Sequence, residues 1–277
     1  MHKYFLFINA MLLTINVYCQ SNVTKTNIVA NKSEITKKIT YYNKCLDFTL
    51  LSEAEMKKII KYAIENYSDD ELAQLQANLA FTKYYKYRPL IIKERMNKAS
   101  GIEKSSLKCQ FAYVNYLNEW KESKYKSNFN PKKQTIIDMQ NAVEEFPSNC
   151  TDYYKLCNLA TATSCFVDDT YKQKNDLIKA WEIFKKSKSK IHCQQTPEGE
   201  ISVNKVLNVE LDNLSQYLSD KKKRNKMKTN INTLSEIQEY IEESSEKDFM
   251  NGNRSKTKLL NIISKYKNEL IGNSLYK

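Results

Sequence analysis

Histidine and cysteine are the residues through which this sequence could carry nucleophilic or metal-assisted chemistry. It has seven cysteines and two histidines, and His192, beside Cys193, is the only histidine other than His2. Because a thiol nucleophile normally needs a histidine base, His192 with Cys193 is the one candidate pair. Structural zinc sites use closely spaced ligand pairs, and the sequence has no Cys-x-x-Cys. We therefore predict no metal, no cofactor and no catalytic residue.

Paired carboxylates are the second chemistry to consider, since two acids at a suitable separation are enough for glycoside hydrolysis. Adjacent acidic pairs occur at Asp168 with Asp169, at Glu144 with Glu145 and at Glu242 with Glu243. Neighbouring residues on a helix point in different directions, so these pairs indicate solvated faces rather than a site. A hydrolase with a carboxylate-based site stays the alternative hypothesis, but the sequence does not select its two acids.

Cysteine can also form a disulfide framework. Apart from Cys19, the cysteines make an even set that an oxidising compartment would pair: Cys45, Cys109, Cys150, Cys157, Cys165 and Cys193. If the helices over 151–191 form an antiparallel hairpin, Cys150 and Cys193 lie at the same end and can be joined. Cys157 and Cys165 cannot, because a helix separates them by roughly 12 Å. Buried free thiols are the alternative.

The N-terminus has the pattern of an export signal. A short basic start precedes an apolar run from Tyr4 to Ile15, which is too short to span a bilayer. Small side chains at Val17 and Cys19 predict cleavage after Cys19. A lipid anchor on Cys19 is the minor alternative, because Tyr18 is large for the position before a lipidated cysteine. We expect a secreted or periplasmic protein.

The elements that must position any site are helices. Only four Gly and four Pro occur in 277 residues, too few for the turns of a β-sandwich or barrel or for a glycine-rich phosphate loop. Ser52 with Glu55 and Ser68 with Glu71 are capping boxes. Apolar stripes predict about nine helices, near residues 52–64, 68–84 (stopped by Pro89), 105–120, 130–146, 151–166, 175–184, 203–218, from 235 onward, and 255–270.

Short connections predict that successive helices pack as antiparallel hairpins, in an all-α array or bundle that can be solenoid-like. We divide the chain into a signal peptide over 1–19, a flexible segment over 20–45 and a main helical domain over 46–220. A basic linker over 221–230 and a C-terminal helical hairpin over 231–277 follow.

Charge is the remaining signal of function. The formal net charge is +12, and the one dense basic run contains Lys221, Lys222, Lys223, Arg224, Lys226 and Lys228. Outside the cytoplasm such a run favours acidic glycans or anionic lipid headgroups, whereas a cytosolic protein of this charge would suggest nucleic acid. A lysine run is also typical of a solvated linker.

These observations predict an exported all-α protein that acts by binding, with a protein or a polyanionic surface as its partner. The alternatives are an extracytoplasmic hydrolase and a secreted effector. Export argues against nucleic acid as the partner.

Overall fold

The computed structural model describes residues 51–80, 82–124, 129–192 and 197–275. These ranges form eleven α-helices and two short 3-10 helices, without a β-strand, so the predicted all-α class is confirmed. The chain divides into two compact units, residues 1–107 and 108–277. The predicted signal peptide, Cys19 and the segment over 20–45 lie outside the described residues.

The N-terminal unit begins with α3 (Glu53–Asn66) and α4 (Asp69–Leu79). Both predicted capping boxes are present: the Ser52 and Ser68 hydroxyls accept the Glu55 and Glu71 amides, and each glutamate accepts its serine's N–H. Satisfying these otherwise unpaired amides is why each helix begins where it does.

The predicted termination of a helix at Pro89 is wrong. The chain leaves the helical path after Leu79, passes through the 3-10 helix η1 (Tyr85–Tyr87), and begins α5 (Arg88–Lys98) with Pro89 in its first turn. Proline is tolerated there because the first helical N–H groups have no intrahelical partner. Tyr84 is fully buried in the core of this unit, where its hydroxyl donates to the Leu51 carbonyl.

Helix α6 (Gly101–Glu122) begins earlier than predicted, at Gly101 rather than Ser105. Gly101 has φ +53°, a left-handed conformation that glycine adopts without strain. The boundary between the two units falls within this helix.

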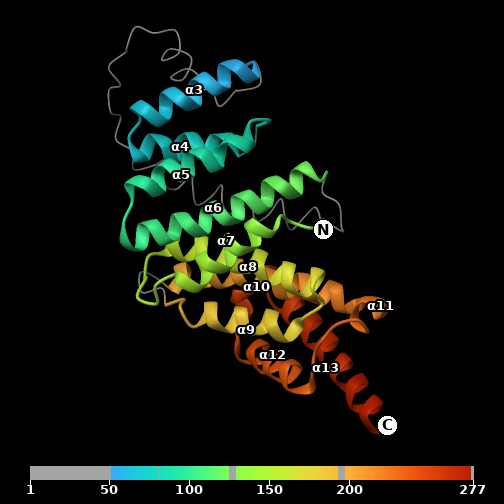
Figure 1. Ribbon diagram of the computed structural model, residues 1–277. Coiled ribbons are helices and arrows are strands. Elements are labelled where there is room, and N and C mark those ends of the chain that lie inside the picture. The colour runs from blue at the N-terminus through green and yellow to red at the C-terminus, as the bar shows by residue number, and fades with distance from the viewer. Residues whose placement is uncertain (1–50, 81, 125–128, 193–196, 276–277) are drawn as a thin grey trace. The chain divides into compact units, whose positions relative to one another are not determined.

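The C-terminal unit is built around α8 (Tyr153–Gln173) and α10 (Pro197–Ser219), which pack against each other (Figure 1). Helix α8 also contacts α7 (Lys133–Glu145) and α9 (Leu177–Lys188). Helix α10 also contacts α11 (Lys221–Arg224), the 3-10 helix η2 (Glu246–Asp248) and α13 (Asn253–Leu275). Helix α12 (Ile231–Glu243) packs on α13 and α9.

Aromatic packing attaches α12 to the rest of this unit. Trp181 and Phe184 on α9 stack with ring centroids 5.0 Å apart, and the Tyr240 ring meets both edge to face. The Tyr240 hydroxyl donates to Asn208 on α10. Residues 231–275 therefore pack within the C-terminal unit, a point that the sequence left open for the predicted C-terminal hairpin.

Helices α8 and α9 begin within two residues of their predicted starts, whereas α10 begins six residues earlier than predicted. The caps of α8 and α9 are Asp152 and Asp176, each with its carboxylate accepting a backbone N–H of the first turn. Carboxylates suit this position because the helix N-terminus is electropositive.

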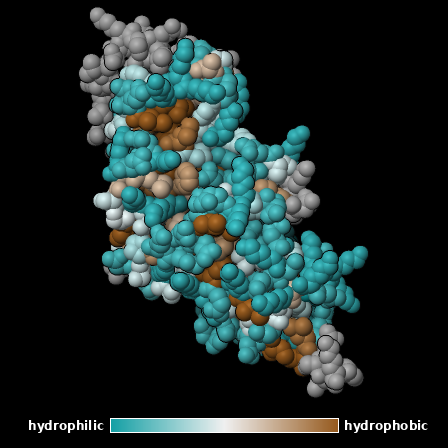
Figure 2. All heavy atoms as spheres, viewed as in Figure 1, coloured by the Kyte–Doolittle hydropathy of each residue, from teal (hydrophilic) through white to brown (hydrophobic). Residues whose placement is uncertain are grey.

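Hydrophilic residues cover most of the face shown in Figure 2. The large apolar side chains that are exposed among the described residues are Leu90, Ile137, Tyr154 and Ile271. No helix in the described ranges combines the length and apolar character needed to cross a membrane.

Candidate functional site

The basic run forms a helical turn where the sequence predicted a linker. Asp220 caps α11, with its carboxylate accepting the N–H of Lys222 at 2.9 Å and of Lys223 at 3.4 Å. The side chains of Lys221, Lys222, Lys223 and Lys226 are exposed, and we call these four residues the basic turn. The segment is ordered because its backbone donors are satisfied and because Arg224 connects it to the core.

Arg224 is not part of the exposed basic surface, contrary to the sequence prediction. Its side chain is only 8% exposed and donates twice, each time at 2.8 Å, to the Glu269 carboxylate on α13. It also donates to the Leu218 carbonyl, and the Arg224 carbonyl accepts the Tyr266 hydroxyl at 2.9 Å. Both bonds to Glu269 come from Nη2 and reach the two oxygens of one carboxylate, and these charge-assisted bonds hold α11 on α13.

Lys228 is also committed to the fold. Its ammonium lies 3.2 Å from the Asp176 carboxylate, and its backbone N–H and C=O bond to Asn175 and Leu177 at the α8–α9 connection. Of the six predicted polyanion-binding residues, the four of the basic turn have exposed ammonium groups that form no ion pair within the described ranges.

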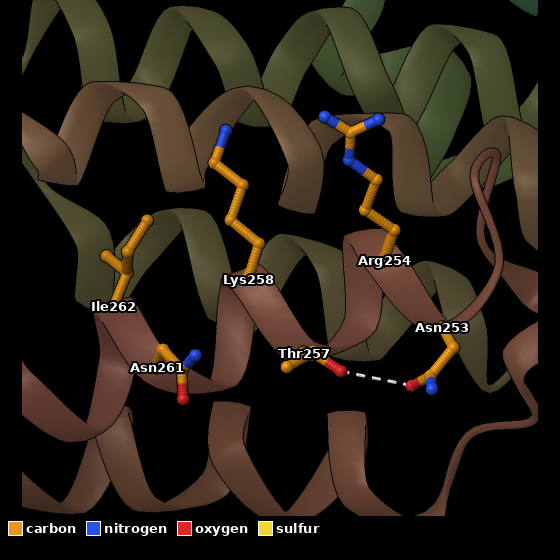
Figure 3. Close-up of a pocket in the computed structure, with 6 residues that line it drawn as sticks. All are labelled: Asn253, Arg254, Thr257, Lys258, Asn261 and Ile262. Atoms are coloured by element: carbon orange, nitrogen blue, oxygen red, sulfur yellow. Dashed lines mark hydrogen bonds between the residues drawn. The ribbon is translucent and has the colours of Figure 1, made fainter.

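A shallow groove of about 620 Å³ runs along the first half of α13 (Figure 3). Arg254 and Lys258 project from the same side of the helix, while Thr257 donates to Asn253 at 3.0 Å. Asn261 and Ile262 complete the lining. The groove contains two cations, one hydroxyl and two amides but no carboxylate, so it is suited to an anionic, hydroxyl-bearing ligand.

A buried acidic network joins three helices of the C-terminal unit. Its members are Tyr116 on α6, Ser164, Asp168, Tyr171 and Lys172 on α8, and Glu210 and Asn213 on α10. Asp168 accepts the Tyr116 hydroxyl at 3.3 Å and forms an ion pair with Lys172. Asp169, its neighbour in sequence, points elsewhere and pairs with Lys174 at 3.5 Å.

The contacts of Tyr171 require one more proton than its hydroxyl supplies. The Tyr171 oxygen lies 3.0 Å from Asp168 Oδ1 and 3.2 Å from Glu210 Oε2, yet a tyrosine hydroxyl has only one proton for these two acceptors. Both contacts become hydrogen bonds when Glu210 is protonated and donates to Tyr171, which then donates to Asp168 Oδ1. Glu210 Oε1 accepts from Ser164 and Asn213.

The electrostatics agree with this assignment. Burial, followed by the negative charge of Asp168, raises the pKa of Glu210 to about 8. Burial alone would lower the pKa of Lys172, but the neighbouring Asp168, with which Lys172 forms an ion pair, outweighs it and raises that pKa. Every carboxylate oxygen in the network already has a partner within the protein. The arrangement therefore stabilises helix packing and leaves no acidic group free to act on a substrate.

The cysteines do not form the expected complete disulfide set. In the described part of the chain, no disulfide joins any two of Cys109, Cys150, Cys157 and Cys165. Cys109 is buried and donates to the Ala142 carbonyl, and burial raises the pKa of its thiol. Burial also raises the pKa of the Cys165 thiol, ahead of the Glu210 charge. Cys45 and Cys193 lie outside the described residues, so the Cys150–Cys193 pair stays a prediction.

Sequence reasoning did not identify three important features: the Asp168–Glu210 association, the role of Glu269 and the groove at Arg254 and Lys258. The first two have no local signal, because their partners are 42 and 45 residues apart in the sequence. The third had a signal in the cations at four-residue spacing on α13.

Comparison of the chain with protein-family models, with curated proteins and with solved structures found no match.

Proposed function

We propose that this chain is an exported helical binding protein whose basic turn attaches it to a polyanionic surface, such as an acidic glycan or anionic lipid headgroups. The observation that carries the proposal is the Arg224–Glu269 pair, which holds a cluster of four exposed lysines on the folded core. A linker would have to be ordered before it could bind. The basic turn is already ordered in the folded protein, so it loses less conformational entropy on binding than a flexible linker would.

The charge distribution supports this proposal. The lysines of the basic turn lie within six residues, and the carboxylate of the adjacent, exposed Asp220 accepts the backbone N–H groups of Lys222 and Lys223. Exposed charges attract a polyanion over roughly 8–10 Å at physiological salt, so neighbouring lysines act together. An acidic protein surface would satisfy the same charges and is the alternative partner.

The proposal includes two further expectations from the sequence. Residues 1–19 serve as the export signal, cleaved after Cys19, and the helices form a solenoid-like array of antiparallel hairpins. A carboxylate-based hydrolase is not supported by the acidic network, since its oxygens are all engaged by protein donors.

Binding of the full chain to labelled heparin and to phosphatidylserine vesicles tests the proposal and separates the two sources of anionic charge. Replacing Lys221, Lys222 and Lys223 by Ala should weaken binding on the order of a hundredfold, because each lysine near an anionic surface contributes about 1 kcal/mol. The affinity should also fall as salt rises.

The matched control removes three exposed lysines from the N-terminal unit by substituting Lys57, Lys58 and Lys93 with Ala. It lowers the net charge by the same amount and should retain binding within about twofold. Equal losses in both variants would mean that net charge, rather than the basic turn, drives association, and would overturn the proposal.

A further inference from the structure

We infer that the binding surface continues from the basic turn along one face of α13, as a linear basic track of Arg254, Lys258 and Lys265 that fits an extended acidic glycan chain. The inference rests on the proposed function and deepens it, because it names the shape and chemical class of the ligand. We use the name basic track for these three residues only.

Helix geometry places the three residues on one face. Lys258 follows Arg254 by four residues and Lys265 follows Lys258 by seven, and both spacings return a side chain to nearly the same side of an α-helix. Figure 3 shows Arg254 and Lys258 projecting together beside the groove. All three side chains are exposed, and none takes part in an ion pair formed by the described residues.

The other lysines of α13 confirm which way the track faces. Lys256 donates to the carbonyls of Glu242 and Ser244 at the end of α12, and Lys267 reaches Gln238 on α12. These two positions are eleven residues apart and share the face of α13 that packs on α12. The basic track lies on the opposite face of the helix, away from the four exposed glutamates of α12.

The track leads to the basic turn. Glu269 follows Lys265 by four residues, and its carboxylate holds Arg224 within α11. From Arg254 to Glu269 the helix rises about 22 Å. The cations are therefore spread along a line, as a chain molecule with repeated negative charges requires. A single phosphate or carboxylate would contact only one or two of them.

The uncharged residues of the groove favour a glycan over a nucleic acid strand. Asn253, Thr257 and Asn261 offer amide and hydroxyl groups that can exchange hydrogen bonds with sugar hydroxyls. Single-stranded nucleic acid is usually bound by aromatic side chains on which bases stack, and no aromatic residue lines the groove within the described residues.

The test compares chain lengths and variants. Wild-type full chain is titrated with a heparin disaccharide and a heparin octasaccharide, and then with single-stranded oligothymidine of matched charge. Substituting Arg254, Lys258 and Lys265 together by Ala should weaken octasaccharide binding on the order of tenfold and leave disaccharide binding nearly unchanged. The slope of log affinity against log salt should decrease by about 2, as three cations are lost.

The basic-turn variant (Lys221, Lys222 and Lys223 to Ala) and the Lys57, Lys58 and Lys93 control are measured in parallel, with circular dichroism to verify folding. If the basic-turn variant loses affinity but the track variant binds the octasaccharide like wild type, the linear track is wrong and the proposed function stands. If neither variant loses affinity, both are wrong. Oligothymidine binding as tight as the octasaccharide would overturn the assignment to a glycan.

Discussion

At the scale of single residues, the most informative group is Glu210. It is 5% exposed and shares the Tyr171 hydroxyl with Asp168. One hydroxyl proton cannot satisfy both carboxyl groups, and a proton on Glu210 supplies the second hydrogen bond. A carboxylic acid held neutral in this way donates a hydrogen bond that a carboxylate cannot.

This proton links stability to pH. An ordinary glutamate releases its proton near 4.5, whereas the folded protein holds the Glu210 proton to about 8. Between these values the folded state binds more protons than the unfolded state, so the free energy of unfolding decreases as pH rises through this window. We expect the melting temperature to fall from pH 5 to pH 8.

Glu210→Gln should flatten that decrease, because the amide donates to Tyr171 at every pH. A shallow slope should remain, since burial also raises the pKa values of Asp169 and Asp212. Thermal unfolding monitored by circular dichroism across this pH range measures the slope. Glu239→Gln, on the exposed face of α12, is the control and should behave like wild type. An unchanged slope in Glu210→Gln would contradict a protonated Glu210.

At the scale of elements, α11 shows how a four-residue helix becomes part of a rigid surface. Such a short helix has little stability of its own, because nucleation is unfavourable. Its order comes from the Asp220 cap and from Arg224, whose guanidinium also lies 5.6 Å from the Tyr266 ring centre. The basic turn therefore depends on a contact with α13 that is distant in sequence.

Glu269→Gln should loosen α11 without unfolding the C-terminal unit. The substitution leaves the buried Arg224 guanidinium facing a neutral amide instead of its charged partner, which weakens the contact between α11 and α13. Amide hydrogen exchange over residues 221–228 should become about tenfold faster or more, while exchange in α8 stays slow. Glu239→Gln again serves as the control. Unchanged exchange at α11 would show that Arg224 is not its anchor.

At the scale of the whole molecule, the full chain carries a formal net charge of +12, and the charges of its C-terminal unit are distributed unevenly over the helices. Helices α11 and α13 carry exposed cations, whereas α12 exposes Glu236, Glu239, Glu242 and Glu243. A polyanion is therefore attracted to one side of this unit and repelled from α12, which orients the bound chain.

Mass spectrometry of the full chain expressed with its own N-terminus, in a host that exports it, tests the processing and thiol expectations. We expect the mature chain to begin at Gln20. Alkylation in denaturant without reductant should label Cys109 and Cys165, because both thiols are unpaired. Retention of residues 1–19 would contradict the export signal, and unlabelled Cys109 or Cys165 would contradict the described cysteine state.

The sequence by itself determined what depends on neighbouring residues. The scarcity of glycine and proline predicted the all-α class, and the capping boxes at Ser52 and Ser68 predicted where two helices begin. These features are local, since they arise from backbone conformation and from hydrogen bonds three residues apart.

The tertiary structure decided everything that required residues from distant helices to meet. Residues of the predicted linker form α11, Arg224 is buried against Glu269, and Glu210 lies beside Asp168. Burial and pairing depend on which helices pack together, and polar side chains do not encode their distant partners in any short-range pattern. For that reason the exposed lysines were identified from the sequence, whereas the contacts that hold them in place were not.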